Sequence, residues 1–240
     1  MKKGKDKDEL IKLIDRKIII NNSIGAALKS MAELVYDNWF VQYEFPDESG
    51  HPYKSYLGDM VWNNNLQKEI PAGWNWSSAP LSKCIASVNE DKSLGDILLG
   101  CKFLLDGCHV IRSIPCNNKW DDPALLSIRP NYKIISSNYL YQVLRSDGFI
   151  YKAEYTCSKG LETQFCKPSN LFPIKSIQVL IPPKRVLQAF DEIVEPMYQK
   201  ILNLFNENQK LAELRDAVLS ELNSLDRIFD DLNKLNRSHN

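Results

Sequence analysis

Two long stretches of helical hydrophobic periodicity enclose a middle section of different character. Over residues 8–43, apolar residues recur at alternating steps of three and four, the pattern of an amphipathic helix. These positions are Leu10, Ile14, Ile24, Leu28, Met31 and Val35. Lys17, Asn21 and Asn38 interrupt the stripe, and polar residues on such a seam can fix the register with a partner helix. The pattern therefore predicts a long helix that packs against another helix.

The C-terminal segment repeats this periodicity over more than five heptads. Its stripe consists of Phe190, Val194, Met197, Ile201, Leu204, Asn208, Leu211, Arg215, Val218, Leu222, Leu225 and Phe229. The alternative is a helix that lies on its own globular domain, but a stripe of about forty residues would extend past a domain of this size. The pattern favours a coiled-coil seam. We expect Pro196 near the start of this helix or at a kink, because an interior proline loses a backbone hydrogen bond.

Between the two helices the chain reads as short strands separated by loops. Residues 44–135 are rich in Gly, Pro, Asn and Trp, with the apolar runs "DILLGCKFLL", "HVIRSI" and "YKIISS". A short helix is predicted over 137–146, and two further strands are predicted in "GFIYKAEYTC" and "IKSIQVLIPP". The Pro182-Pro183 pair should end the last strand. The predicted class is α+β, with one mixed α/β globule flanked by two long helices.

Composition adds few constraints. The chain has 240 residues, 44% of them apolar and 25% charged, which suits one large domain or a medium domain with an extension. No apolar run approaches the roughly 20 residues that a membrane span requires. The N-terminal "MKKGKDKDELIKLIDRK" is charged rather than apolar, so it is not a secretory signal. We expect a cytoplasmic protein.

Residues with metal-binding or catalytic chemistry are scattered. The six cysteines form no C-x-x-C pair and the three histidines are far apart, so reduced, mostly buried thiols are favoured over a zinc site. Phosphate-binding loops, nucleophile elbows and H-E-x-x-H motifs are missing from the sequence. A metal-dependent nuclease would need Asp47 close to Glu90 and Asp91, although Asp47 sits in an obvious turn sequence. We predict a non-enzymatic protein without a cofactor.

Charge is uneven along the chain, although the net charge is zero. Residues 72–180 carry twelve Lys/Arg against nine Asp/Glu, whereas 181–240 carry eight against ten. Residues 1–50 carry eight against nine. The basic middle fits a face that binds a polyanion about as well as it fits an ordinary solvated surface.

One stretch combines closely spaced aromatics with Pro and Gly turns. It runs "KIIINNSIGAALKSMAELVYDNWFVQYEFPDESGHPYKS" and continues into "MVWNNNLQKEIPAGW". The fixed positions are Asn21 and Asn22, Tyr36 to Phe40, Tyr43 to Asp47, Gly50 to Tyr53, Met60 to Asn63 and Ile70 to Trp74. Over about fifty residues this pattern resembles the central conserved region of type I restriction-modification specificity (S) subunits.

Two later segments extend the resemblance. The segment "KGLETQFCKPSNLFPIKSIQVLIPP" is similar to the end of the family's target recognition domain. The segment "AFDEIVEPMYQKILNLFNENQKLAELRDAVLSEL" resembles the family's distal conserved helix. The chain thus corresponds to the C-terminal half of the family pattern, with one recognition domain instead of two. A natural half-size subunit, a recombining cassette and a fragment all fit this pattern.

The resemblance implies a division of labour. Residues 1–45 would be the N-terminal spacer helix, 46–183 the junction and target recognition domain, and 184–240 the C-terminal coiled-coil helix. The recognition domain would read one half of a bipartite sequence in double-stranded DNA. The helices would form an antiparallel coiled coil and dock methyltransferase (M) subunits and, through them, restriction (R) subunits, with a homodimer possible through the coiled coil. The alternative is a coiled-coil scaffold whose globule binds protein rather than DNA.

Candidate contact residues follow from side-chain chemistry and position. The loop "CSKGLETQFCKPSN" best combines groups that read bases and bind phosphates, through Ser158, Lys159, Gly160, Thr163, Gln164 and Lys167. Second-tier DNA candidates, chosen on charge and location, are Lys102, Arg112, Lys119, Arg129, Lys133 and Lys152. Candidates for a partner interface are Trp39, Phe40, Tyr43, Asn208, Leu211, Arg215 and Val218. Phe45, Tyr53 and Trp74 complete an aromatic set with the aromatic residues among these candidates. We favour the interpretation that this set joins the helix end to the globule over the interpretation that it faces a partner.

Overall fold

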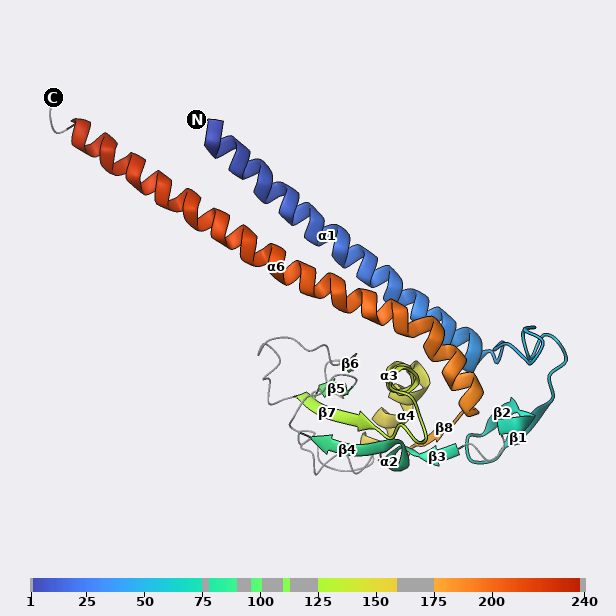
Figure 1. Cartoon of the computed structure of the whole chain (residues 1–240). Helices are drawn as coiled ribbons and strands as arrows, with labels where there is room; N and C mark the ends of the chain where they lie inside the picture. Colours follow the sequence, from blue (N-terminus) through green and yellow to red (C-terminus); the bar gives the residue numbers. More distant parts are fainter. Residues whose placement is uncertain are drawn as a thin grey trace. The chain divides into compact units, whose positions relative to one another are not determined.

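The computed structural model describes residues 2–74, 78–89, 96–100, 110–112, 125–158 and 175–237 (Figure 1). It has an α+β fold with a long helix near each end of the chain and small antiparallel sheets, which confirms the predicted class. The chain forms two compact units: unit 1 comprises residues 1–30 and 197–240, and unit 2 comprises residues 31–196. Among the described helices, none has a stretch both long and apolar enough to cross a membrane.

Unit 1 consists of most of helix α1, Lys2–Tyr36, and the C-terminal part of helix α6, Lys184–Arg237. Polar side chains connect the two helices at several levels. Lys7 Nζ lies 2.6 Å from Glu221 Oε2, and Arg215 Nη1 lies 3.3 Å from Asp15 Oδ1. The residue number rises along α1 as it falls along α6, so the helices run antiparallel in this unit.

A cluster of amides forms the most buried polar contact of unit 1. Asn21 is 1% exposed, and its Nδ2 donates to Asn208 Oδ1 at 2.8 Å and to Glu207 Oε2 at 3.0 Å. Asn208 Nδ2 in turn donates to Asn22 Oδ1 at 2.9 Å. Lys17 Nζ lies 3.4 Å from Glu207 Oε1. Lys17, Asn21 and Asn208, which interrupt the predicted stripes, therefore make polar contacts across the helix pair.

The apolar stripe predicted on α1 is only partly right. Ile14 is buried, but Leu10, Ile24 and Met31 are 40%, 39% and 50% exposed. Gly25 and Ala32 lie on the less exposed side instead. In places, the less exposed face of α1 therefore lies one residue further along the chain than the predicted stripe. Small residues there allow a closer approach of neighbouring helices, whose separation depends on the side chains at the contact.

Gly25 provides a test of this helix face. It lies inside α1, and a Cβ atom built at this position meets nothing within 4 Å. Because glycine is about 1 kcal/mol less favourable than alanine in a helix interior, we expect Gly25→Ala to raise the free energy of unfolding by about 0.5–1 kcal/mol. Urea denaturation followed by circular dichroism checks this. A loss of stability would mean that α6 approaches closer than the structure indicates.

Unit 2 is centred on an aromatic cluster. After α1, the five-residue π-helix η1, Asp37–Val41, brings Phe40 into the core, where it is 3% exposed. The Phe40 ring centroid lies 4.6 Å from that of Tyr139 and 5.0 Å from that of Phe190. The rings of Tyr36 and Trp74 complete its surroundings at 5.5 Å and 6.2 Å. Segments far apart in the sequence therefore meet at one side chain.

The described strands of unit 2 form three antiparallel sheets. Two are two-stranded: β1, Met60–Asn63, pairs with β2, Lys68–Pro71, and β3, Ser78–Pro80, pairs with β8, Gln178–Leu180. The third has the order β4-β7-β5-β6, with bounds Ile85–Asn89, Leu125–Pro130, Ile97–Gly100 and Val110–Arg112. The short helices are η2, Ala72–Trp74, α2, Leu81–Cys84, α3, Ser137–Arg145, and α4, Asp147–Ser158. Strands predicted in "DILLGCKFLL", "HVIRSI" and "IKSIQVLIPP" coincide with β5, β6 and β8, and the predicted helix over 137–146 coincides with α3.

The strand predicted in "GFIYKAEYTC" is wrong, because this segment forms helix α4. The Oγ atom of Ser146 accepts the backbone N–H of Phe149, as a helix N-cap does. Phe149 and Ala153 are buried, whereas Tyr151 and Tyr155 are exposed. This i, i+4 spacing marks one face of a helix, and the aromatic content of the run obscured it.

The strand predicted in "YKIISS" is also wrong, because Tyr132, Lys133 and Ile134 form a turn. The Asn131 carbonyl accepts the N–H groups of Ile134 and Ile135, at 2.8 Å and 3.0 Å. The Asn131 side-chain oxygen accepts the N–H of Lys133. Asparagine bonded to the following backbone is a turn former that competes with strand formation.

A polar network fixes α3 to the first turns of α6 within unit 2. Asn138 Nδ2 donates to Asp191 Oδ1 at 3.0 Å and to Glu195 Oε2 at 2.9 Å. Ser136 Oγ donates to the same Asp191 oxygen at 3.0 Å. Pro196 follows inside α6, twelve residues after the helix begins and at the last position of unit 2. We expected Pro196 near the start of the helix or at a kink, and it lies inside α6 after the first turns.

Candidate functional site

The loop favoured for DNA contact begins where α4 ends. Ser158 is the last residue of α4. The other first-tier candidates lie outside the described residues: Lys159, Gly160, Thr163, Gln164 and Lys167. Lys102 and Lys119 also lie outside them, and Arg112 is the last residue of β6. The assignment of these residues to DNA contact therefore stays a prediction.

Arg129 on β7 has a structural partner. Its Nε atom donates to Asp96 Oδ1 and its Nη2 atom donates to Asp96 Oδ2, each at 3.0 Å. Ser127 Oγ donates to Asp96 Oδ2 at 2.9 Å. The Asp96 side chain is 1% exposed and that of Arg129 is 36% exposed. A forked pair of this kind holds the guanidinium in one orientation while its outer part reaches solvent.

Two lysines from different elements of unit 2 bring positive charge together. Lys68 on β2, which sequence reasoning missed, places its Nζ 5.3 Å from the centroid of the Tyr43 ring. Burial of this ammonium, and then the positive charge of Lys152 on α4, lower the pKa of Lys68. Lys152 is exposed, as is Lys133 in the turn after β7. Lys68 and Lys152 are separated by 84 residues in the sequence, so their proximity in the fold could not be predicted from the sequence.

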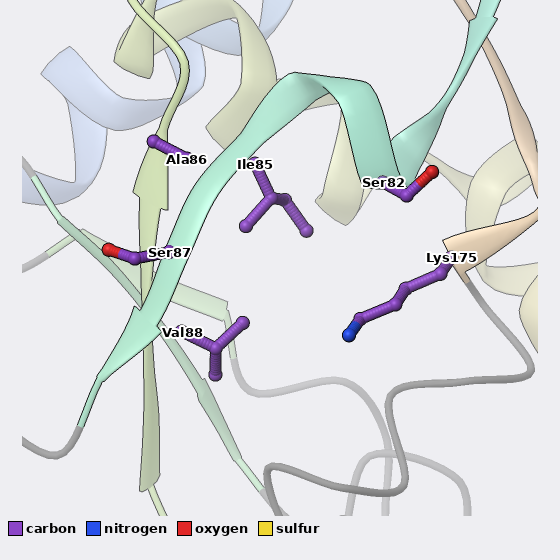
Figure 2. Close-up of a pocket in the computed structure, with 6 residues that line it drawn as sticks. All are labelled: Ser82, Ile85, Ala86, Ser87, Val88 and Lys175. Carbon is purple, nitrogen blue, oxygen red and sulfur yellow. The ribbon is translucent and has the colours of Figure 1, made fainter.

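A shallow pocket of about 340 Å³ lies at the start of β4 (Figure 2). The pocket is lined by Ser82 from α2, by Ile85, Ala86, Ser87 and Val88 from β4, and by Lys175. Lys175 precedes β8 in the chain, and its side chain extends toward β4 (Figure 2). Its ammonium is a donor of the kind that phosphate contacts use. Lys175 is a second residue that the sequence did not single out.

The described residues contain no group of three His, Cys, Asp or Glu side chains arranged to hold a metal ion. Asp47 serves its own turn, because one carboxylate oxygen accepts the N–H groups of Ser49 and His51 at 2.7 Å and 2.9 Å. The hydrogen bond from the His51 backbone is the main cause that lowers the pKa of Asp47. Glu90 and Asp91 lie outside the described residues.

Cys84 is a buried free thiol, and its burial raises the pKa of the Cys84 side chain to about 11. It is therefore a neutral thiol at physiological pH, as expected of a structural cysteine rather than a reactive one.

The residues proposed for a partner interface fall into two groups. Asn208, Leu211, Arg215 and Val218 lie on the less exposed stripe of α6 in unit 1. Trp39, Phe40 and Tyr43 are buried within the chain, at 8%, 3% and 4% exposure. Burial raises the pKa of Tyr43 to about 12. This burial is what we expect if the aromatic set joins the helix end to the globule, and contact with a partner chain stays a prediction.

Comparison with known proteins gives one informative match. The chain is 24% identical, over 253 aligned positions, to the type I restriction enzyme MjaIX specificity subunit of Methanocaldococcus jannaschii. The alignment covers 81% of this chain and 52% of that protein, so the chain spans about half the length of the curated relative it matches. No family model matches the chain, and no solved structure matches it. The chain is thus similar over most of its length to a type I restriction enzyme specificity subunit, a protein of the family whose central motifs its sequence resembles.

Proposed function

We propose that this chain is a sequence-specific DNA-recognition subunit of a type I restriction-modification complex. The observation that carries the proposal is the match to a specificity subunit over 81% of the chain, together with the central-region motifs between Asn21 and Trp74. In this proposal residues 46–183 form the junction and target recognition domain and read one half of a bipartite site. Residues 1–45 and 184–240 serve as spacer helices.

The two helices form an antiparallel coiled coil that docks the methyltransferase subunits. Cross-helix bonds at Asp15, Asn21 and Lys7 support an antiparallel pairing of fixed register. The helix α1 also exposes apolar side chains that its own chain leaves uncovered: Leu13, Ile19 and Ile20 are 58%, 64% and 46% exposed. Uncovered apolar residues along a helix are typical of a protein interface.

The DNA-binding surface lies on the globule. The exposed lysines Lys133 and Lys152, with Lys68 and Lys175, supply positive charge on unit 2, and the loop at 158–167 supplies Lys, Thr and Gln side chains. Such groups bind phosphates and base edges. The subunit itself performs no chemistry, and methyl transfer and cleavage take place on partner chains.

Methylome sequencing tests the proposal directly. The gene is expressed together with a type I methyltransferase gene from the same genome in a host without type I systems. We expect adenine methylation confined to one defined bipartite sequence, with none when either gene is left out. A palindromic site would indicate that two copies of this chain act together, and an asymmetric one that a second recognition domain comes from another protein.

A double variant separates DNA recognition from a scaffold role. Lys159→Ala/Lys167→Ala should abolish site-specific methylation while the chain still binds the methyltransferase. The matched control is Lys200→Ala/Lys210→Ala on α6, which should leave methylation unchanged. If the first double variant methylates the same site as the wild type, these lysines do not contact DNA. If no sequence-dependent methylation occurs with any variant or the wild type, the scaffold hypothesis replaces the proposal.

A further inference from the structure

The loop between η1 and β1 can be followed in Figure 1. It presents the most exposed large apolar side chain among the described residues. Leu57 is 93% exposed and its neighbour Tyr56 is 63% exposed. We call these two residues the Leu57 tip and residues 44–59 the tip loop. The tip loop belongs to unit 2, and none of its residues is among the DNA-contact candidates named above.

Backbone hydrogen bonds hold the tip loop in one conformation. Tyr53 N–H donates to the Phe45 carbonyl at 2.9 Å, and Lys54 N–H donates to the Tyr43 carbonyl at 3.2 Å. Gly58 N–H closes the turn under the tip by donating to the Tyr53 carbonyl at 2.9 Å. The loop therefore resembles a short irregular hairpin rather than a flexible linker.

Side chains reinforce the same conformation. Glu44 accepts both the backbone N–H and the hydroxyl of Ser55, and Tyr53 Oη donates to the Asp59 carbonyl at 2.9 Å. The His51 and Tyr56 rings stack with centroids 4.2 Å apart. The base of the loop is tied to the buried aromatic core, because the Phe45 ring stacks on Trp74 at 4.8 Å.

Close packing under the tip leaves no space for a side chain at Gly58. A Cβ at this position would lie 2.4 Å from the Tyr53 ring and 2.6 Å from the Tyr53 carbonyl oxygen. The carbonyl belongs to the backbone, so it cannot move aside without breaking the turn. The position and direction of the residue before Gly58 are thereby fixed.

Leu57 is an unfavourable residue for its position. Its φ angle is +63°, in the left-handed region, where a non-glycine residue costs about 1–2 kcal/mol. Glycine or asparagine would adopt this conformation more easily. Because Leu57 is 93% exposed, burial within the chain does not offset this cost. A branched apolar side chain held out on a fixed loop is instead suited to insertion into another molecule.

The charge of the tip loop favours a protein over DNA as that molecule. Residues 44–59 contain Glu44, Asp47, Glu48 and Asp59 but only one lysine, Lys54. Hydrogen bonds lower the pKa of Glu44 and of Asp47, so both are ionised at neutral pH. This negative charge repels a phosphate backbone and attracts a basic protein surface.

We propose that the tip loop is a preformed docking element whose Leu57 side chain inserts into an apolar pocket with a basic rim on the methyltransferase subunit. This assignment rests on the proposed function, because the methyltransferase is the partner that function requires. The loop acts in addition to the helices. Being fixed beforehand, it loses little conformational entropy on binding, and preorganised loops gain affinity for this reason.

Affinity measurements with two matched variants test the assignment. The full chain is titrated by calorimetry into the purified type I methyltransferase used in the methylation test. Leu57→Asn keeps the size and suits the left-handed backbone but removes the apolar surface, and we expect it to weaken binding about tenfold or more. Leu57→Met keeps an apolar side chain and should bind within about threefold of the wild type. Both variants should melt at or above the wild-type temperature, since Leu57 packs against little in its own chain.

Three results would overturn the assignment. If Leu57→Asn binds the methyltransferase as tightly as the wild type, the tip is not part of the interface, although the proposed function stands. If Leu57→Asn weakens binding to a DNA duplex and leaves methyltransferase binding intact, the tip contacts DNA instead. If the wild-type chain itself does not bind the methyltransferase, the partner role within the proposed function fails and the assignment of the tip loop fails with it.

Discussion

Replacing Phe40 with alanine is expected to lower the free energy of unfolding by about 3–5 kcal/mol. Phe40 is 3% exposed, and five other aromatic rings have centroids within 6.3 Å of its own. Truncation would leave a cavity between segments that are distant in sequence, and edge-to-face contacts with Tyr139 and Phe190 would be lost with it. The midpoint of urea unfolding, followed by near-ultraviolet circular dichroism, measures the effect.

The neighbouring Val41 is the matched control. It is 55% exposed, so Val41→Ala should change stability by less than about 0.5 kcal/mol. The pair also separates the two roles considered for the aromatic set. If Phe40→Ala left stability near that of the wild type but abolished binding of the methyltransferase, Phe40 would belong to an interface and not to the core.

Replacing Arg129 with methionine is expected to destabilise the fold by about 3–5 kcal/mol. The change removes two hydrogen bonds to Asp96, whose carboxylate is 1% exposed and carries a full negative charge when ionised. A buried carboxylate that loses its cation is far less stable than a buried neutral pair. Thermal unfolding of the purified variant gives the measurement.

The double variant Asp96→Asn/Arg129→Met shows whether charge is the cause. It removes both charges, so we expect it to recover more than half of the stability lost by Arg129→Met. Lys133→Met, four residues along in an exposed turn, should be close to neutral. If the double variant is as unstable as Arg129→Met alone, the loss of stability comes from packing rather than from the unpaired carboxylate.

The two long helices could be predicted from sequence, whereas two short elements could not. A 3.6-residue hydrophobic repeat sustained over several turns is specific to an amphipathic helix. The turn at Asn131 and the helix α4 were missed, although Ser146 and the Phe149–Ala153 spacing carry a local signal. Both errors come from reading aromatic and β-branched content as strand in place of the capping and turn chemistry beside it.

The contacts of the candidate site were harder to predict, because they depend on the register between paired strands. Arg129 was chosen as a DNA candidate on charge alone, and Asp96 lies 33 residues earlier in the chain. Their meeting follows from the pairing of Ile97 with Ile128 between β5 and β7, because Asp96 precedes the first residue of this pair and Arg129 follows the second. No local pattern encodes that alignment. The charge interaction of Lys68 with Lys152 likewise joins two elements, β2 and α4, that are far apart in sequence.

The buried amide of Asn21 has a consequence for how the chain is made. Its bonding partners Glu207 and Asn208 are synthesised long after α1. About 160 residues separate α1 from the paired part of α6, and at roughly 5–20 residues per second the ribosome takes on the order of 10–30 s to make them. Throughout that time α6 does not yet cover Ile14 and the other apolar residues of α1. Nascent chains of this protein should therefore be substrates for a ribosome-associated chaperone until α6 emerges, and α1 should be the segment that the chaperone holds.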